Sequence, residues 1–271
     1  MCVYQHTNGD MRSVEYVDGL NTWTIPSVVS NSTSPLLPTV INKDGVLYSA
    51  HASIVDIVYG QWVKGNSKIS YLSPWSSTYD LKVGAGSGTN IPTNYSPSLE
   101  YHTNSGGVDF LITAVINNGT NLGEPAVYWR YSGTNYTSTT APSIALGISS
   151  PSELNASICP IAVEDELFLF YTAPGFSSGS ELLIRCVHAS VAGSGSGAIS
   201  SSWTSGSVPD AYTNHKIDGF YDPGTECIVL VFQNFYTGDI DLAKSCDFGT
   251  TWDLDVTGIA PISGAPSIAN L

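Results

Sequence analysis

The chain is poor in positive charge. Its 271 residues include only 9 Lys and Arg against 23 Asp and Glu, which gives a formal net charge of −14 at pH 7. The few basic residues form no stripe of the kind that binds a phosphate backbone, and an acidic surface repels such a backbone. Nucleic acids and anionic membranes are therefore unsuitable partners, and membrane insertion is not expected.

Long apolar runs and helix-forming stretches are also lacking. The longest apolar segments, such as residues 227–232, are far too short to cross a bilayer. The 26 Gly and 15 Pro are turn-forming residues at a density that long helices do not tolerate. With 42% hydrophobic residues the chain still has enough apolar surface for a core. A helical bundle is excluded, and a soluble globular protein is expected.

Cysteine is scarce and follows no recognisable pattern. The five cysteines, at positions 2, 159, 186, 227 and 246, are an odd number without C-x-x-C spacing, so neither a disulfide framework nor a zinc site is predicted. We expect reduced, mostly buried thiols. The N-terminus lacks a charged segment followed by an apolar one, which predicts a cytoplasmic protein, or one secreted without a recognisable signal peptide. Five N-x-S/T sequons matter only in the secretory pathway: Asn31, Asn94, Asn118, Asn135 and Asn155.

Five similar units recur along the chain. Each contains an apolar, β-rich run bounded by turn residues, at 3–6, 46–52, 110–116, 167–173 and 227–233. A shorter strand precedes each of the last four runs, at 39–41, 98–101, 160–162 and 217–220. A third strand follows each run, and an aromatic residue opens the fourth: Trp23, Tyr79, Tyr136, Trp203 and Trp252. Four strands in each of five repeats predict a β-propeller, because so small a sheet buries its faces only against its neighbours.

The two ends of the chain complement each other. The first apolar run lacks a preceding strand, and residues 265–270 repeat the Pro-Ser-apolar pattern of such a strand. We expect this segment to complete the N-terminal blade and close the ring. The prediction is an all-β protein with a single domain at residues 1–271, a five-bladed β-propeller of four-stranded antiparallel blades. A six-bladed propeller and a β-sandwich are the alternatives.

The most specific local motif is S-x-D-x-G-x-T-W at residues 245–252. It resembles the Asp-box of sialidase-like β-propellers at Ser245, Asp247, Gly249 and Trp252. In such a turn the carboxylate accepts backbone amides, the glycine takes a positive φ, and the tryptophan packs between sheets. An Asp-box stabilises the scaffold and says nothing about the substrate. The wider sequence resembles fungal-type propeller lectins in architecture and style of site.

A polar and aromatic set repeats on the expected hairpins between second and third strands. Arg130, Arg185 and Lys244 are predicted to occupy equivalent places in the third strands of blades three, four and five. Aromatic rings combined with charged groups bind sugar rings and their hydroxyls. The predicted carbohydrate-binding residues are Asp10, Arg12, Trp62, Lys68, Glu124, Trp129, Arg130, Glu181, Arg185, Tyr236, Asp239 and Lys244. The alternative for each is a solvated cross-strand pair or packing between blades.

These features favour a lectin without enzymatic activity, which binds glycans or glycoproteins through several equivalent, shallow sites and acts by avidity. The first alternative is a glycoside hydrolase or sialidase-like enzyme with one central site, in which two inward carboxylates flank the scissile bond. No acid stands at the start of the innermost strands, where Thr39, Ser98, Pro160 and Ile217 lie. A protein-interaction platform is the third hypothesis.

No cofactor is predicted. The five histidines lie alone and form neither a metal motif nor a triad motif. The pairs Asp239/Asp241 and Asp253/Asp255 each place two carboxylates on one face of a strand, which leaves calcium open. An oxygen-rich calcium site needs more ligands than either pair supplies.

Overall fold

A computed structural model describes residues 2–5, 10–17, 20–30, 38–43, 46–56, 60–68, 74–76, 79–83, 89–91, 93, 95–116, 125–131, 137–140, 157–174, 182–195 and 197–259. The regular elements within these ranges are β-strands. No helix in this part of the chain is long and apolar enough to span a membrane.

Four sheets contain four antiparallel strands each, hydrogen-bonded in chain order, and we number them II to V. Their first strands are β6 (Thr39–Lys43), β12 (Ser98–Thr103), β16 (Ile158–Val163) and β20 (Asp218–Asp222). Their second strands are β7 (Val46–Asp56), β13 (Asp109–Ile116), β17 (Glu166–Pro174) and β21 (Cys227–Gln233). Their third strands are β8 (Gly60–Lys68), β14 (Pro125–Tyr131), β18 (Leu182–Ser190) and β22 (Ile240–Ser245). Their fourth strands are β9 (Tyr79–Asp80), β15 (Thr137–Thr140), β19 (Thr204–Tyr212) and β23 (Asp253–Ile259).

Sheet I, at the N-terminus, has three described strands in the order β1 (Cys2–Gln5), β2 (Met11–Val14) and β5 (Ser27–Ser30). Two short hairpins supplement the sheets. One joins β3 (Tyr16–Val17) to β4 (Thr22–Trp23), and the other joins β10 (Lys82–Val83) to β11 (Thr89–Asn90).

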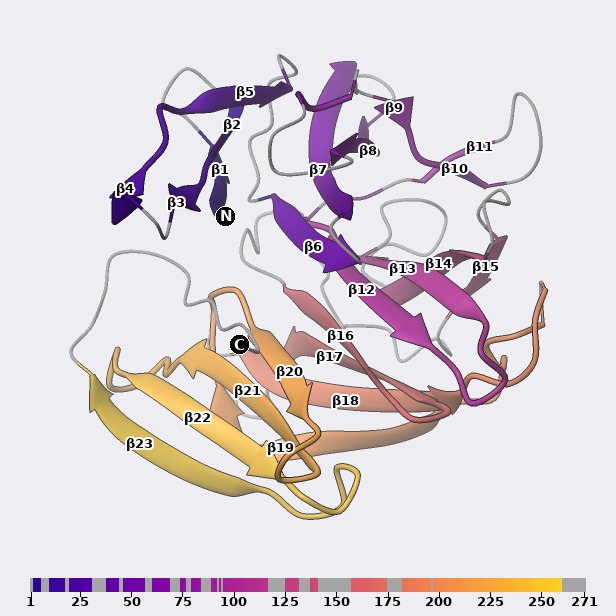
Figure 1. The fold of residues 1–271 in the computed structure, drawn as a ribbon. Helices are drawn as coiled ribbons and strands as arrows, with labels where there is room; N and C mark the ends of the chain where they lie inside the picture. The colour runs from indigo at the N-terminus through magenta and orange to yellow at the C-terminus, as the bar shows by residue number, and fades with distance from the viewer. Residues whose placement is uncertain are drawn as a thin grey trace.

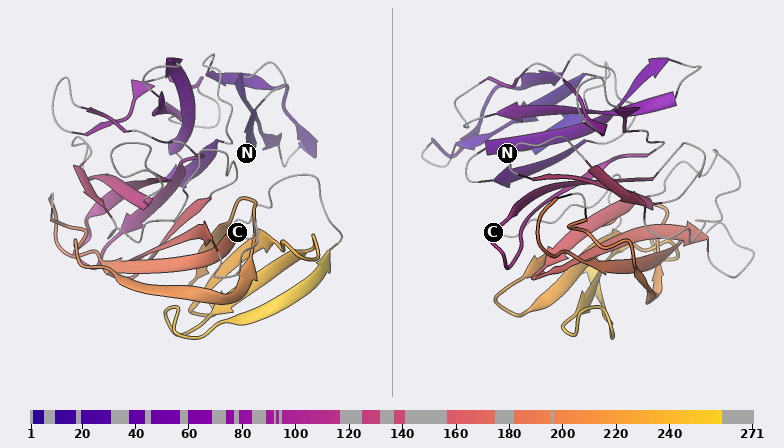
Figure 2. Two further views of the ribbon diagram at one scale, coloured as in Figure 1. Left: turned by 180° about the vertical axis from the view of Figure 1, so that it is seen from behind. Right: turned by 90° about the vertical axis from the view of Figure 1, so that its right-hand side faces the viewer.

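The sheets fan out around a common centre, as Figure 1 shows, with their first strands innermost. Contacts link β1 to β6, β6 to β12, β12 to β16, and β16 to β20, so neighbouring sheets meet chiefly through these strands. Figure 2 shows from the side that each sheet is twisted. Side chains that face the centre therefore come from four or five different segments of the sequence.

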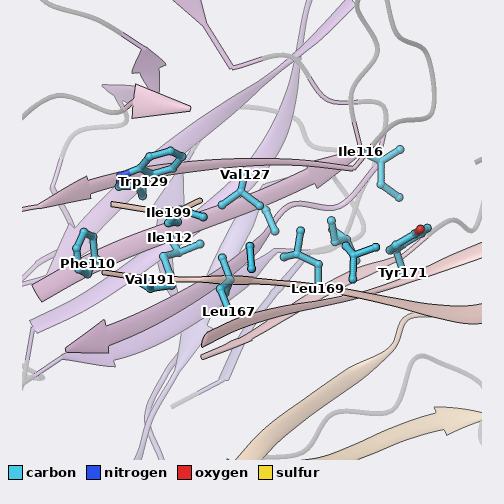
Figure 3. Close-up of a cluster of buried hydrophobic side chains, with 14 of the residues drawn as sticks. Phe110, Ile112, Ile116, Val127, Trp129, Leu167, Leu169, Tyr171, Val191 and Ile199 are labelled. Carbon is cyan, nitrogen blue, oxygen red and sulfur yellow. The ribbon is translucent and has the colours of Figure 1, made fainter. Parts of the chain in front are cut away.

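The core lies between neighbouring sheets. Figure 3 shows the cluster between sheets III and IV, where the rings of Phe110, Trp129 and Tyr171 pack with aliphatic side chains of both sheets. A second cluster joins sheets IV and V, and a third joins sheets II and III. The strands of sheets III and IV are apolar on both faces because both faces are buried in this way.

The sequence-based prediction of an all-β protein with four-stranded antiparallel sheets is confirmed for sheets II to V. The expected first and second strands appear with boundaries shifted by at most a few residues. Tyr79 opens β9, and Trp203 and Trp252 directly precede β19 and β23. Trp23 instead lies in the β3–β4 hairpin and is 55% exposed. Tyr136 and the closing segment 265–270 lie outside the described residues.

The turn from Ser245 to Trp252 joins β22 to β23 and has the predicted hydrogen bonds. Asp247 accepts from the Thr251 amide at 2.8 Å and from the Thr251 hydroxyl at 2.6 Å, and these bonds hold the pKa of Asp247 below its usual value. Gly249 has a φ of 79°, and its amide donates to the Ser245 hydroxyl. The ring of Trp252 packs edge-on against Phe170 of sheet IV, with 5.5 Å between ring centroids. The turn thus ties sheet V to its neighbour.

The expectation that the thiols are reduced is wrong for two cysteines. Cys227, the first residue of β21, forms a disulfide with Cys246, which directly follows β22. Sequence spacing missed this bond because the two residues are 19 positions apart and meet only when β21 pairs with β22. Cys159 and Cys186 are free and buried, as expected.

Replacing both Cys227 and Cys246 by Ser is expected to lower the free energy of unfolding by about 2–4 kcal/mol, because the unfolded chain loses a cross-link. The measurement is thermal unfolding without reductant. Dithiothreitol should shift the wild-type midpoint by a similar amount and leave the double variant unchanged. A thiol titration of the unreduced, denatured wild type that finds all 5 cysteines free would contradict the bond.

Candidate functional site

Polar side chains gather where the first strands of sheets III, IV and V meet. Glu100 lies on β12 opposite Ile112, which belongs to the core between sheets III and IV, so its side chain faces sheet IV. Cys159 of β16 belongs to the core between sheets IV and V. Asp218 opens β20. We call Glu100, Cys159 and Asp218, with the adjacent Lys216, the central cluster.

Glu100 is the most strongly perturbed carboxyl group of the cluster. Burial among the first strands raises its pKa to about 8, a hydrogen bond from the Ala162 amide opposes the shift, and the charge of Asp218 adds to it. The residue is neither fully buried nor fully exposed to solvent. Glu100 is therefore a carboxylic acid that retains its proton near neutral pH.

The other groups of the cluster act on one another electrostatically. Burial raises the pKa of the Cys159 thiol well above its usual value, and the carboxylates of Asp218 and Glu100 add to the shift, while Lys216 opposes it. Asp218 is partly buried, and its Oδ1 accepts a hydrogen bond from the Gly219 amide at 3.0 Å. The chain thus places two carboxyl groups and one cation within electrostatic range at the centre of the sheets.

Buried hydrogen bonds fix the strands that carry these groups. The hydroxyl of Ser157, just before β16, accepts from the Ile217 amide at 2.8 Å, which joins the start of β20 to the start of β16. The Ser157 amide in turn donates to the hydroxyl of Thr172 on β17 at 3.0 Å. Because these groups are buried, their loss would leave unsatisfied polar atoms in the core. The position of Asp218 is set by this network.

Gly219 allows β20 to lie close to its neighbours. A Cβ atom at this position would stand 2.5 Å from the Val229 carbonyl oxygen, 2.7 Å from a Leu230 methyl group and 3.1 Å from a methyl group of Ile161. Only glycine fits here without displacing backbone atoms. Gly219 faces Ile161 of sheet IV, and Asp218, which pairs with Val231, lies on the opposite face of β20.

The structure spreads the predicted sugar-binding residues over several sheets. Asp10 and Arg12 form an ion pair at 3.9 Å on sheet I. Trp129 is fully buried between sheets III and IV, and its indole nitrogen donates to the Gly195 carbonyl, so its ring presents no face to a ligand. Tyr236 is 64% exposed on the hairpin between β21 and β22. Of the remaining positions, Trp62 and Lys68 lie in β8 without described side chains, and Glu124 and Glu181 lie outside the described residues.

The expected equivalence of the three basic residues is wrong. Followed through the strand pairings to the first strand of each sheet, the three residues are in different registers. Arg130 aligns with the fourth residue of β12, Arg185 with the first residue of β16, and Lys244 with the third residue of β20. Arg130 lies over the ring of Tyr48 in sheet II, at 5.5 Å from its centroid. Lys244 lies on the opposite face from Ala243, which packs in the core between sheets IV and V. These side chains do not form repeated sites.

The sequence-based search looked for acids one or two positions too early. In a hydrolase, the innermost strands were expected to carry an acid at Ile217 and at Ser98. Asp218 comes one residue after Ile217, and Glu100 comes two residues after Ser98. The available signal was an acidic residue within an otherwise apolar first strand. No group of three or more His, Cys, Asp or Glu side chains among the described residues could hold a metal ion.

Solved structures with the same fold are enzymes that act on sugars. The GH93 α-L-arabinofuranosidase of Fusarium graminearum, in complex with arabinobiose, has a TM-score of 0.57 and 12% identity over 95% of this chain and 76% of its own. The α-L-arabinanase of Penicillium chrysogenum, also with arabinobiose, has a TM-score of 0.53 and 13% identity over 93% and 79%. The catalytic domain of a GH62 α-L-arabinofuranosidase of Coprinopsis cinerea has a TM-score of 0.51 and 12% identity over 82% and 68%. No family model and no curated protein matches the chain.

The likeness to these structures shows a β-propeller fold. They contradict the prediction of a lectin without enzymatic activity, because all three of the structures described above are those of glycoside hydrolases. The central carboxyl groups Glu100 and Asp218, which the lectin interpretation took to be missing, agree with this correction. No family model and no curated protein supports the resemblance to fungal-type lectins or to the Asp-box family.

Gly219→Ala is expected to lower the free energy of unfolding by about 1–3 kcal/mol, because the added methyl group overlaps backbone atoms of β21. Urea unfolding measures the change. Gly206→Ala is the matched control, since a Cβ there would meet nothing within 4 Å. Equal stability of the two variants would show that β20 does not lie as close to its neighbours as described.

Glu100→Gln is expected to raise the free energy of unfolding by about 2–4 kcal/mol at pH 8. At pH 4 the free energy of unfolding should hardly differ from that of the wild type. The folded protein binds the Glu100 proton more tightly than the unfolded chain does. Wild-type stability therefore falls, relative to the variant, as pH rises from the ordinary value of 4.5 to about 8. Urea unfolding of both proteins across this range measures the difference. A constant difference would mean that Glu100 ionises as in water.

Proposed function

We propose that the protein is a glycoside hydrolase with Glu100 as general acid and Asp218 as the second carboxylate. The observation that carries the proposal is the raised pKa of Glu100 beside Asp218. Glycoside hydrolysis uses two carboxyl groups, one protonated to donate to the leaving oxygen and one ionised to act as base or nucleophile. Environments that push the pKa values of two acids apart produce such a division of roles.

Each residue of the central cluster has a defined part in this reaction. Glu100 donates its proton to the glycosidic oxygen as the bond breaks. Asp218, oriented by the Gly219 amide, either activates water or attacks the anomeric carbon. Lys216 provides a positive charge within electrostatic range of Cys159 at the same place. No metal ion is needed for these steps.

The substrate class follows from fold and charge together. The three solved enzymes described above are two arabinofuranosidases and an arabinanase, two of them with arabinobiose bound. A net charge of −14 repels polyanionic glycans. Neutral, arabinose-containing polysaccharides are therefore the first substrates to test, and glycans are the proposed partners.

We further propose that the sheets form one closed, five-bladed domain over residues 1–271, in which the C-terminal segment completes sheet I. The five repeated units of the sequence support this number. A secreted location is favoured over the cytoplasm, because the Cys227–Cys246 disulfide and the five sequons suit an oxidising, glycosylating pathway.

Glu100→Gln and Asp218→Asn are each expected to reduce kcat on arabinan by about 10²–10⁴-fold, because each removes one of the two reacting groups. Reducing-sugar release from purified protein measures the loss. In the wild type, kcat/KM is expected to fall on the alkaline side near pH 8, where Glu100 loses its proton.

Glu166→Gln is the matched control for this experiment. Glu166 is also a partly buried carboxylate, but it opens β17 opposite Val163, the last residue of β16, and pairs with His188 of β18 at 3.1 Å. Its activity should equal that of the wild type. Full activity of Glu100→Gln, or equal losses in all three variants, would overturn the assignment.

A further inference from the structure

The hairpin between β21 and β22 is held rigid by its own hydrogen bonds. The side-chain oxygen of Asn234 accepts from the amides of Tyr236 and Thr237 at 2.8 and 3.2 Å. Its side-chain nitrogen donates to Asp241 at 2.6 Å, and Asp241 is only 3% exposed. Backbone bonds between Asn234 and both Asp239 and Gly238 close the turn. Asn234 therefore fixes the conformation of a loop whose tip carries an aromatic side chain.

That aromatic side chain is Tyr236, which stays 64% exposed although its position is fixed. Its ring meets Phe235 and Tyr212 edge to face, with ring centroids 5.2 and 5.5 Å apart. The Phe235 amide donates to the Tyr212 carbonyl at 2.9 Å and so ties the hairpin to the end of β19. We call Tyr212, Phe235 and Tyr236 the aromatic platform. A ring that is already ordered loses little entropy when it contacts a ligand.

The platform lies at the same end of sheet V as Asp218. Asp218 pairs with Val231, and β21 ends two residues later, where the hairpin begins. The five residues from Val231 to Tyr236 span at most about 18 Å. The segment from Tyr212 to Asp218 also joins the platform directly to the central cluster along the chain. A ligand that extends from Asp218 toward the hairpin therefore reaches Tyr236 after a few sugar units.

We propose that the aromatic platform binds a distal part of a neutral polysaccharide chain, with Tyr236 stacking on a sugar ring several units from the bond that is cleaved. This inference rests on the proposed function for the position of the cleaved bond. An aromatic face packs on the apolar face of a sugar ring, and neighbouring amides and hydroxyls bond its hydroxyl groups. The hairpin supplies the ring of Tyr236 and the hydroxyl of Thr237, and residues 233–238, which read Gln-Asn-Phe-Tyr-Thr-Gly, carry no charge. The site thus selects polymers over short glycosides.

Tyr236→Ala is expected to lower kcat/KM on linear arabinan about tenfold, which corresponds to about 1.4 kcal/mol, and to leave hydrolysis of p-nitrophenyl α-L-arabinofuranoside unchanged. Tyr236→Phe, which keeps the ring, should retain most of the activity on arabinan. Phe248→Ala is the matched control, because Phe248 is also an exposed aromatic residue (49%) but follows Ser245 at the opposite end of sheet V. Equal losses on both substrates in Tyr236→Ala would overturn the proposal, since a distal platform acts only on long chains.

A binding experiment separates this inference from the proposed function. Affinity electrophoresis through gels that contain arabinan, arabinoxylan or xylan measures retention of the Glu100→Gln variant with and without Tyr236→Ala. The platform is supported if at least one polymer retains the protein, and if this retention is lost with Tyr236→Ala and kept with Phe248→Ala. This holds even if the wild type cleaves none of the polymers. Retention that does not depend on Tyr236, or no retention by any of them, contradicts it. Thermal unfolding midpoints within a degree of one another show that folding is unaffected.

Discussion

Apolar packing between neighbouring sheets is the interaction on which the rest of this structure depends. A four-stranded sheet with both faces apolar is not stable alone, so sheet IV needs sheet III on one side and sheet V on the other. This requirement forces the first strands of adjacent sheets together at the centre. Any polar side chain on those strands is then placed among apolar neighbours. The site and the core are consequences of the same arrangement.

The central cluster shows how burial at the first strands changes the pKa of a carboxyl group. Burial that would penalise an ionised carboxylate keeps Glu100 protonated, and Asp218 reinforces the effect. A surface glutamate would have no such property, because water would stabilise its charge. The same burial makes Glu100 unfavourable for folding above its ordinary pKa, so reactivity and stability oppose each other at this residue. The hydroxyls of Ser157 and Thr172 and the close packing at Gly219 hold β16 and β20 in place beside Glu100.

Local sequence patterns predicted sheets II to V, but they did not predict the central cluster. Alternating runs, turn residues and the repeated order of strands predicted sheets II to V, because those features depend on neighbours in sequence. The turn at Asp247 was predicted in detail for the same reason. The disulfide, the inequivalent registers of Arg130, Arg185 and Lys244, and the meeting of Glu100 with Asp218 depend on pairing between distant segments. A shift of two residues along a first strand decides whether an acid lies at the centre, and the sequence pattern does not resolve such a shift.

The hairpin at Asn234 differs from the central cluster in what determines its structure. Its rigidity comes from local hydrogen bonds and needs no neighbouring sheet, apart from the Tyr212 contact that sets its direction. Such a loop can change its sequence without disturbing the packing that keeps Glu100 protonated. In the proposed function, reactivity depends on the first strands β12 and β20, and in the proposed platform, polymer preference depends on the turn after β21. Under these two proposals, substitutions at the hairpin are expected to change the preferred polymer, whereas a change at the first strands is expected to alter folding and chemistry together.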